Sequence, residues 1–219
     1  MICRSCLRMI RRLTLSSVLV LLACGLFFPL VHAEPARVLV LWVDDGDSIV
    51  LSGGERVRYL GINAPEVAHK DKPGEPFGNE ARAFNKKLVQ GHRVKLEVGE
   101  QQRDRYGRLL AFVFLEDGTF VNGELIRRGF AHLLRKQPKL RYWERLLGLQ
   151  REALQEKRGI WSVPVVKVEK YYIGNKRSWI FHRPHCRFGL KTASGNRVRF
   201  NGRYEPLYQG FSPGRRCKP

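Results

Sequence analysis

The chain has 219 residues, of which 43% are hydrophobic, so it can bury a full core and is not a disordered protein. It carries 40 Lys and Arg residues against 20 Asp and Glu residues, a formal net charge of +20. The distribution of this charge along the chain says more about the protein's partners than its total.

Residues 1–33 have the organisation of a signal peptide. Four arginines and no acid precede an apolar stretch at 13–31, and Val31-His32-Ala33 resembles a small-residue cleavage site. We therefore predict a secreted or periplasmic protein that begins near Glu34 and has no stable membrane association after cleavage. Two alternatives stay open: the apolar stretch could remain as a membrane anchor, or the chain could be processed as a lipoprotein at Cys24.

The next 130 or so residues alternate between strand and helix patterns. Apolar, β-rich runs separated by turns predict five strands, at 37–43, 48–54, 55–62, 92–100 and 109–118. Helical spacing of apolar residues predicts three helices, at 74–91, 121–134 and 140–159. Five strands with a helix after the third predict an α+β fold, a closed barrel of the oligonucleotide/oligosaccharide-binding (OB) type with three helices.

Several motifs in this body carry a family resemblance. They are, in chain order, Asp45-Gly46-Asp47, Arg58-x-x-Gly61-Ile62-Asn63-Ala64-Pro65-Glu66, Asp104-x-Tyr106-Gly107-Arg108, Val121-Asn122-x-x-Leu125-Ile126-x-x-Gly129 and Gly159-Ile160-Trp161-Ser162. Each motif is weak alone, but their order and spacing together resemble the staphylococcal nuclease (thermonuclease) family over residues 37 to 163.

The resemblance implies a calcium-dependent phosphodiesterase that cleaves DNA and RNA. It implies catalytic roles for Arg58, Glu66 and Arg108, and calcium ligation by Asp47, Asn63 and the backbone carbonyl of Ala64. Asn63 departs from the family pattern, which usually has a second aspartate there, so one negative charge is missing from the implied calcium site. Asp44 and Asp45 stay outside the predicted site, because the resemblance places the ligand at Asp47.

These residue types suit phosphodiester hydrolysis. A phosphodiester is an anion, so the site needs positive charge where oxygens become more negative as water adds to phosphorus. Arg58 and Arg108 supply permanently charged, planar groups, and Glu66 can accept a proton from the attacking water. The alternative is a non-catalytic nucleic-acid-binding OB-fold protein with a degenerate metal site, of which Asn63 would be the sign. We favour the enzyme because binding alone would not require all three catalytic side chains.

Residues 164–219 form a predicted basic module, separate from a thermonuclease-like domain at 34–163. They hold 13 Lys and Arg but only 2 Asp and Glu, a net charge of +11, interleaved with aromatic residues. This asymmetry indicates a polyanionic partner, nucleic acid before membrane, and predicts contact with DNA or RNA mainly through the phosphate backbone. A charged surface that is simply solvated is the alternative.

The basic module has its own resemblance. Tyr172-Ile173-Gly174-Asn175-Lys176, Phe181-His182-x-Pro184-x-Cys186 and Gly210-Phe211-x-Pro213-Gly214-x-x-Cys217 resemble the small zinc-binding module of the Ada alkyl-DNA repair protein. The implied zinc ligands are His182, Cys186 and Cys217, with Gly214 where a further cysteine is expected and His185 as a substitute. A disulfide between Cys186 and Cys217 is the alternative.

Overall fold

The computed structural model describes residues 37–70, 72–135, 140–164 and 167–219. The predicted signal peptide, including Cys24 and the expected cleavage site, lies outside these residues. In the part of the chain that the structure describes, no helix combines the length and the apolar character needed to cross a membrane.

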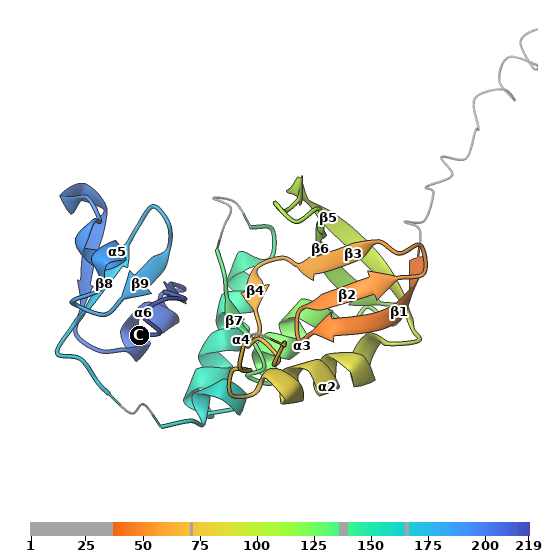
Figure 1. The fold of residues 1–219 in the computed structure, drawn as a ribbon, viewed down its shortest axis with the longest axis horizontal. Coiled ribbons are helices and arrows are strands. Elements are labelled where there is room, and N and C mark those ends of the chain that lie inside the picture. Colours follow the sequence, from red (N-terminus) through yellow and green to blue (C-terminus); the bar gives the residue numbers. More distant parts are fainter. Residues whose placement is uncertain (1–36, 71, 136–139, 165–166) are drawn as a thin grey trace, which may run out of the picture. The chain divides into compact units, whose positions relative to one another are not determined.

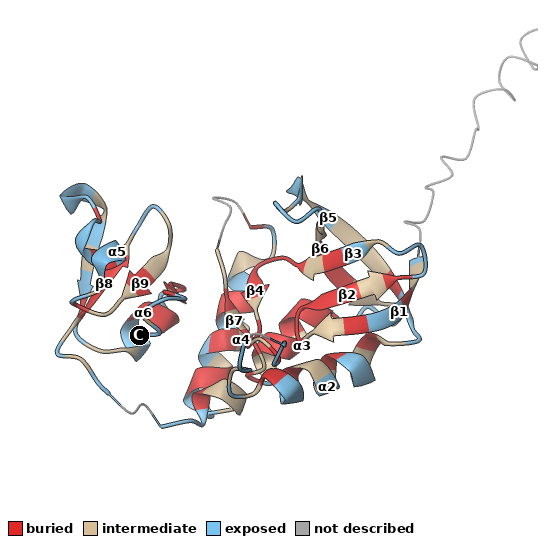
Figure 2. Cartoon of the chain, viewed as in Figure 1, coloured by how far each residue is buried: buried red, intermediate tan, exposed pale blue. Residues whose placement is uncertain are grey.

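Five strands form a closed barrel in the order β1-β2-β3-β6-β5 (Figure 1). Their bounds are β1 (Arg37–Asp45), β2 (Ser48–Leu51), β3 (Arg56–Tyr59), β5 (Arg93–Arg103) and β6 (Leu109–Leu115). Neighbouring strands are antiparallel except for β3 and β6, which run parallel. Residues that are buried concentrate in the barrel strands and the helices beside them (Figure 2). The predicted α+β barrel is confirmed.

Three helices accompany the barrel as predicted: α2 (Gly78–Val89), α3 (Val121–Arg127) and α4 (Trp143–Gln155). Each contributes one fully buried side-chain amide that bridges to another element. Asn85 of α2 accepts from the Tyr59 hydroxyl and donates to the Asp45 carbonyl. Asn122 of α3 accepts from the backbone N–H of Val113 and donates to a carbonyl of the loop after β3. These paired amides fix each helix at one position, because an unpaired amide in the core is costly.

The helix predicted at 121–134 is wrong in its second half, because α3 ends at Arg127. Gly129 has φ of 70°, and a side chain there would meet the carbonyl of Arg158, so the chain must turn at this glycine. It then forms β7 (His132–Leu133), which pairs with β4 (Ile62–Asn63) in a two-stranded sheet. This pairing places His132 opposite Asn63.

The C-terminal module has a four-stranded sheet in the order β10-β8-β9-β11. Its elements are β8 (Tyr172–Asn175), β9 (Ile180–His182), α5 (Arg187–Leu190), a short 3-10 turn η2 (Ser194–Asn196), β10 (Arg197–Phe200), α6 (Tyr204–Tyr208) and β11 (Ser212–Pro213). Another 3-10 turn, η1 (Gly159–Trp161), precedes the module.

The core of this module continues onto α4. One hydrophobic cluster joins Ala153, Leu154 and Trp161 to the module's Tyr172, Phe181, Phe200, Leu207 and Phe211. Gln150 of α4 is fully buried and bridges β7 and α6. Its Oε1 accepts from the Leu133 N–H at 2.8 Å, and its Nε2 donates to the Leu207 carbonyl at 2.8 Å. The basic module is therefore packed onto the nuclease-like region by apolar area and buried hydrogen bonds, although the division at residue 163 stays a prediction.

We expect Gln150→Leu to lower the free energy of unfolding by about 1–3 kcal/mol, because it leaves the buried Leu133 N–H without a partner. The Leu207 carbonyl loses its bond from Gln150 but still accepts from the Gly210 N–H at 3.1 Å. Urea denaturation measures the loss. Gln155→Leu is the matched control, since it makes the same change at an exposed position of α4 and should alter stability by less than about 0.5 kcal/mol. Equal effects of the two variants would contradict the bridging role of Gln150.

Candidate functional site

Arg58, on β3, is the centre of the site. Its Nη2 lies 2.8 Å from Asp47 Oδ2 and donates to Asn63 Oδ1 at 3.1 Å, while its Nη1 donates to the carbonyls of Tyr59 and Ile62 at 2.9 and 3.0 Å. Opposite Arg58 on β2 is Ser48, the residue after Asp47, so strand register brings this ion pair together. The guanidinium is therefore held in one orientation by four acceptors.

Asp47 and the turn at residues 63–64 form one hydrogen-bonded group. Asp47 Oδ2 also accepts from the backbone N–H of Ala64 at 2.6 Å, and its Oδ1 accepts from the Ser48 hydroxyl at 3.1 Å. Asn63 Nδ2 donates to the Ala64 carbonyl at 3.2 Å and lies 3.4 Å from Nε2 of His132. Burial lowers the pKa of His132, which favours its neutral form. The three predicted calcium ligands thus lie within one short network.

Asp45 belongs to the site, although the sequence prediction left it out. A donor atom of Asp45 lies within 4.8 Å of one from Glu66 and one from His69. Burial and the negative charge of Asp47 raise the pKa of Asp45, so a cation at this place would relieve repulsion between two carboxylates. The signal that could have found it is the motif Asp45-Gly46-Asp47 itself, whose first aspartate ends β1 beside the β1–β2 turn.

Arg108 approaches the same region from the start of β6. Its Nε and Nη2 lie 2.9 and 2.7 Å from Asp104 Oδ2, and its Nη1 lies 3.4 Å from the Ser48 hydroxyl. Burial raises the pKa of Asp104, but hydrogen bonds from Arg108 and from two backbone N–H groups outweigh it, and the pKa is lowered. Asp104 therefore stays charged and positions the guanidinium.

A hollow of about 430 Å³ collects these groups; we call it the inner hollow. Its lining includes the predicted Asp47, Arg58, Asn63, Glu66 and Arg108, together with Asp45, Asp104, Tyr106 and Arg215. Ala64 does not line it and lies behind it, through its bonds to Asp47 and Asn63. Two fixed guanidinium groups and a carboxylate facing one cavity can bind an anion and activate a water beside it. Arg215, from the C-terminal module, was not expected from the sequence.

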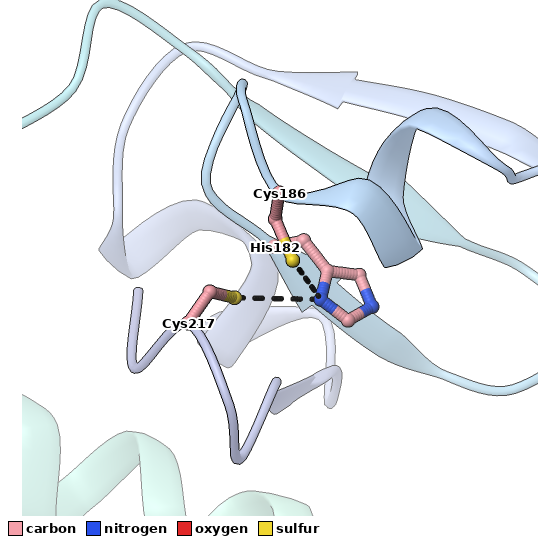
Figure 3. A group of neighbouring side chains, drawn as sticks. All are labelled: His182, Cys186 and Cys217. Carbon is pink, nitrogen blue, oxygen red and sulfur yellow. Dashed lines mark hydrogen bonds between the residues drawn. The ribbon is translucent and has the colours of Figure 1, made fainter.

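The predicted metal ligands of the C-terminal module also converge (Figure 3). His182 Nδ1 lies 3.6 Å from Cys186 Sγ and 3.4 Å from Cys217 Sγ, and both cysteines are free thiols. A Cβ at Gly214 would lie 2.5 Å from His182 Nδ1 and 3.1 Å from Cys217 Sγ, so position 214 faces the group as a fourth ligand would. His185 is exposed and is not part of the group, so it does not replace the missing ligand in this structure.

Comparison with known proteins agrees with this geometry. Residues 56–163 match the family model described as staphylococcal nuclease homologue. The thermonuclease of Staphylococcus hyicus is 35% identical over 134 residues, which cover 60% of this chain and 79% of that protein. The thermonuclease of Staphylococcus intermedius is 36% identical over 57% of this chain and 75% of its own length. Endonuclease YncB of Bacillus subtilis (strain 168) is 36% identical over 54% of this chain and 58% of its own length. The chain therefore belongs to the staphylococcal nuclease family and is a nuclease enzyme of that type.

Proposed function

We propose that this chain is an exported, calcium-dependent nuclease that hydrolyses phosphodiester bonds of DNA, RNA or both. Its membership of the nuclease family implies a nucleic-acid substrate. The observation that supports hydrolysis of phosphodiester bonds at this site is the convergence of Arg58, Glu66 and Arg108 on the inner hollow. A binding protein has no need of a carboxylate at the point where two arginines could hold a phosphate.

The two arginines have the properties that a transition state of phosphoryl transfer requires. Arg58 is mostly buried and bonded to four acceptors, and Arg108 is held by Asp104, so neither group has to be reoriented when charge develops on the phosphate. Such preorganised charge in a partly desolvated site is worth more than the same charge in water. Neutralisation of the phosphate oxygens is the role we assign to both.

Glu66 is the general base of this proposal. Its carboxylate is partly exposed, lines the inner hollow and can therefore reach a water there. Proton transfer by a positioned carboxylate contributes about 100-fold or more to a hydrolytic rate. The acceptor of the proton is thus separate from the two groups that stabilise negative charge.

The donor set of the site fits calcium. Carboxylate, amide and backbone carbonyl oxygens are the ligands that this ion prefers. Asp45, Asp47 and Asn63 present carboxylate and amide oxygens along the inner hollow, while the Ala64 carbonyl lies outside its lining and accepts from Asn63. When bound, calcium would add positive charge beside the phosphate. Burial first, and the charge of Asp47 second, raise the pKa of Asp45, so a cation beside these carboxylates would favour their charged forms.

In the C-terminal module, the group His182, Cys186 and Cys217 supports a zinc site with three protein donors. Imidazole and thiolate are the ligands that zinc prefers, and three of them with an open position make an exchangeable site. Metal analysis and thiol titration of the purified protein test this: bound zinc is expected, whereas a metal-free protein with no free thiols would establish the disulfide instead.

Export is supported by the basic and apolar leader at residues 1–33. Sequencing the N-terminus of the protein recovered from outside the cytoplasm should find a start near Glu34. A lipid-modified Cys24, or a chain that retains its leader in the membrane, would establish one of the two alternatives.

The proposed reaction is tested by cleavage of DNA and RNA with added calcium and then with a chelator. We expect cutting that stops when calcium is removed. Glu66→Gln should lower the rate about 100-fold or more while nucleic acid still binds, because proton transfer is lost. Glu80→Gln, at an exposed position of α2, is the matched control and should cut at the wild-type rate. Binding without any cutting by the wild-type protein would favour a non-catalytic binding protein.

Asn63→Asp tests the calcium site. The change restores a negative charge without altering size, so we expect half-maximal activity at a lower calcium concentration. The oxygen that accepts from Arg58 is kept in this variant. Asn201→Asp, exposed in the C-terminal module, adds the same charge away from the site and should leave the calcium dependence unchanged. A calcium dependence that Asn63→Asp does not move would show that position 63 does not contact the cation.

A further inference from the structure

The C-terminal module contributes a residue to the nuclease site. Arg215 Nη2 donates to Glu66 Oε1 at 2.7 Å, and Arg215 lines the inner hollow. Glu66 is the proposed general base, whereas Arg215 lies far beyond residue 163, where the match to the family model ends. Three arginines that line the inner hollow are paired with carboxylates in this structure: Arg58 with Asp47, Arg108 with Asp104 and Arg215 with Glu66.

A second ion pair joins the same two segments. Lys218 Nζ lies 3.0 Å from Glu75 Oε1, and Glu75 Oε2 accepts from the backbone N–H of Glu66 at 3.2 Å. Burial raises the pKa of Glu75, but hydrogen bonds from Lys218 and from the Glu66 backbone outweigh it and lower the pKa. Two cations of the C-terminal segment therefore lie over the loop that carries the general base.

These contacts border a second hollow of about 630 Å³, which we call the outer hollow. It shares Glu66, Tyr106, Arg108 and Arg215 with the inner hollow, so the two adjoin. Five Lys and Arg side chains line it against two Glu side chains; its full lining is Arg56, Glu66, Val67, His69, Lys72, Pro73, Glu75, Tyr106, Arg108, Arg215 and Lys218. A surplus of positive charge next to the cleavage site suits a chain of phosphates.

The segment that carries Arg215 and Lys218 is hydrogen-bonded to the rest of the C-terminal module. Arg183 donates from Nε to the Cys217 carbonyl at 2.9 Å and from Nη2 to the Lys218 carbonyl at 3.0 Å. Cys217 Sγ lies against His182, and the Gly214 N–H donates to the Phe181 carbonyl at 2.9 Å. Little backbone entropy of this segment therefore remains to be lost when the two cations meet a ligand.

We propose that the outer hollow binds the nucleic-acid strand that flanks the scissile bond, through its phosphates, with Arg215 and Lys218 as contacts supplied by the C-terminal module. This assignment rests on the proposed nuclease function. The two ion pairs are solvent-exposed, with Arg215 71% and Lys218 69% exposed, so each is worth little and a phosphate can displace the carboxylate. Binding of substrate would then release Glu66 from Arg215 and leave the general base free to act.

The test is a double variant, Arg215→Gln with Lys218→Gln, in the full mature chain. Binding of a fluorescent single-stranded oligonucleotide of about 20 nucleotides is measured by anisotropy, in chelator, so that nothing is cut. We expect the affinity to fall about 10-fold or more at physiological salt, and the slope of log K against log salt to become shallower by about 1.4, as loss of two phosphate contacts predicts. In the cleavage assay, the double variant should raise KM for long polymers more than it raises KM for dinucleotide-sized substrates.

The matched control is Lys176→Gln with Arg177→Gln, which removes two exposed cations of the same module that line neither hollow. Circular dichroism establishes that both proteins are folded. If both double variants bind with the wild-type affinity and salt slope, or lose affinity equally, the outer hollow is not a phosphate site. Because binding is measured without cutting, a wild-type protein that cleaves nothing would overturn the nuclease proposal while the binding result still decides this one.

Discussion

The ion pair between Arg58 and Asp47 is the interaction on which the site depends. Both groups are nearly inaccessible to solvent, and a buried charge is tolerated only when it is paired and its remaining hydrogen-bonding groups are satisfied. Asp47 also holds the Ala64 amide, while Arg58 also holds Asn63 and the carbonyl of Ile62. The proposed catalytic arginine and the proposed calcium ligands are therefore positioned by the same bonds that close the turn after β3. Catalytic geometry and local stability are not separable here.

The barrel topology then brings the second arginine to the first. Because β3 and β6 are parallel neighbours, Arg58 lies opposite Leu110, two residues beyond Arg108. The loop before β6 supplies Asp104, which fixes the direction of the Arg108 side chain. A rigid sheet with charged groups at the ends of its strands suits catalysis by electrostatic preorganisation, since the groups need not move as charge develops.

The C-terminal module changes how the site is enclosed. A basic tail attached only by a linker would raise affinity for any polyanion without regard to where it is cut. This module instead shares a hydrophobic cluster with α4 and is joined to it through Gln150. Its last residues therefore reach the loop of Glu66 through two ion pairs, which places positive charge beside the proposed cleavage site.

The sequence alone determined the barrel strands and where its three helices begin, because periodicity is a local property that survives into the fold. The candidate site residues came from the order and spacing of motifs that resemble the staphylococcal nuclease family. This resemblance predicted Arg58, Glu66, Arg108, Asp47 and Asn63, and the inner hollow brings these together. Only the tertiary structure decided the end of α3, since the turn at Gly129 is imposed by the nearby Arg158 carbonyl and by pairing of β7 with β4. It also decided the places of Asp45 and Arg215. Arg215 is 149 residues from Glu66 along the chain, and no local pattern records a contact that packing between distant segments creates.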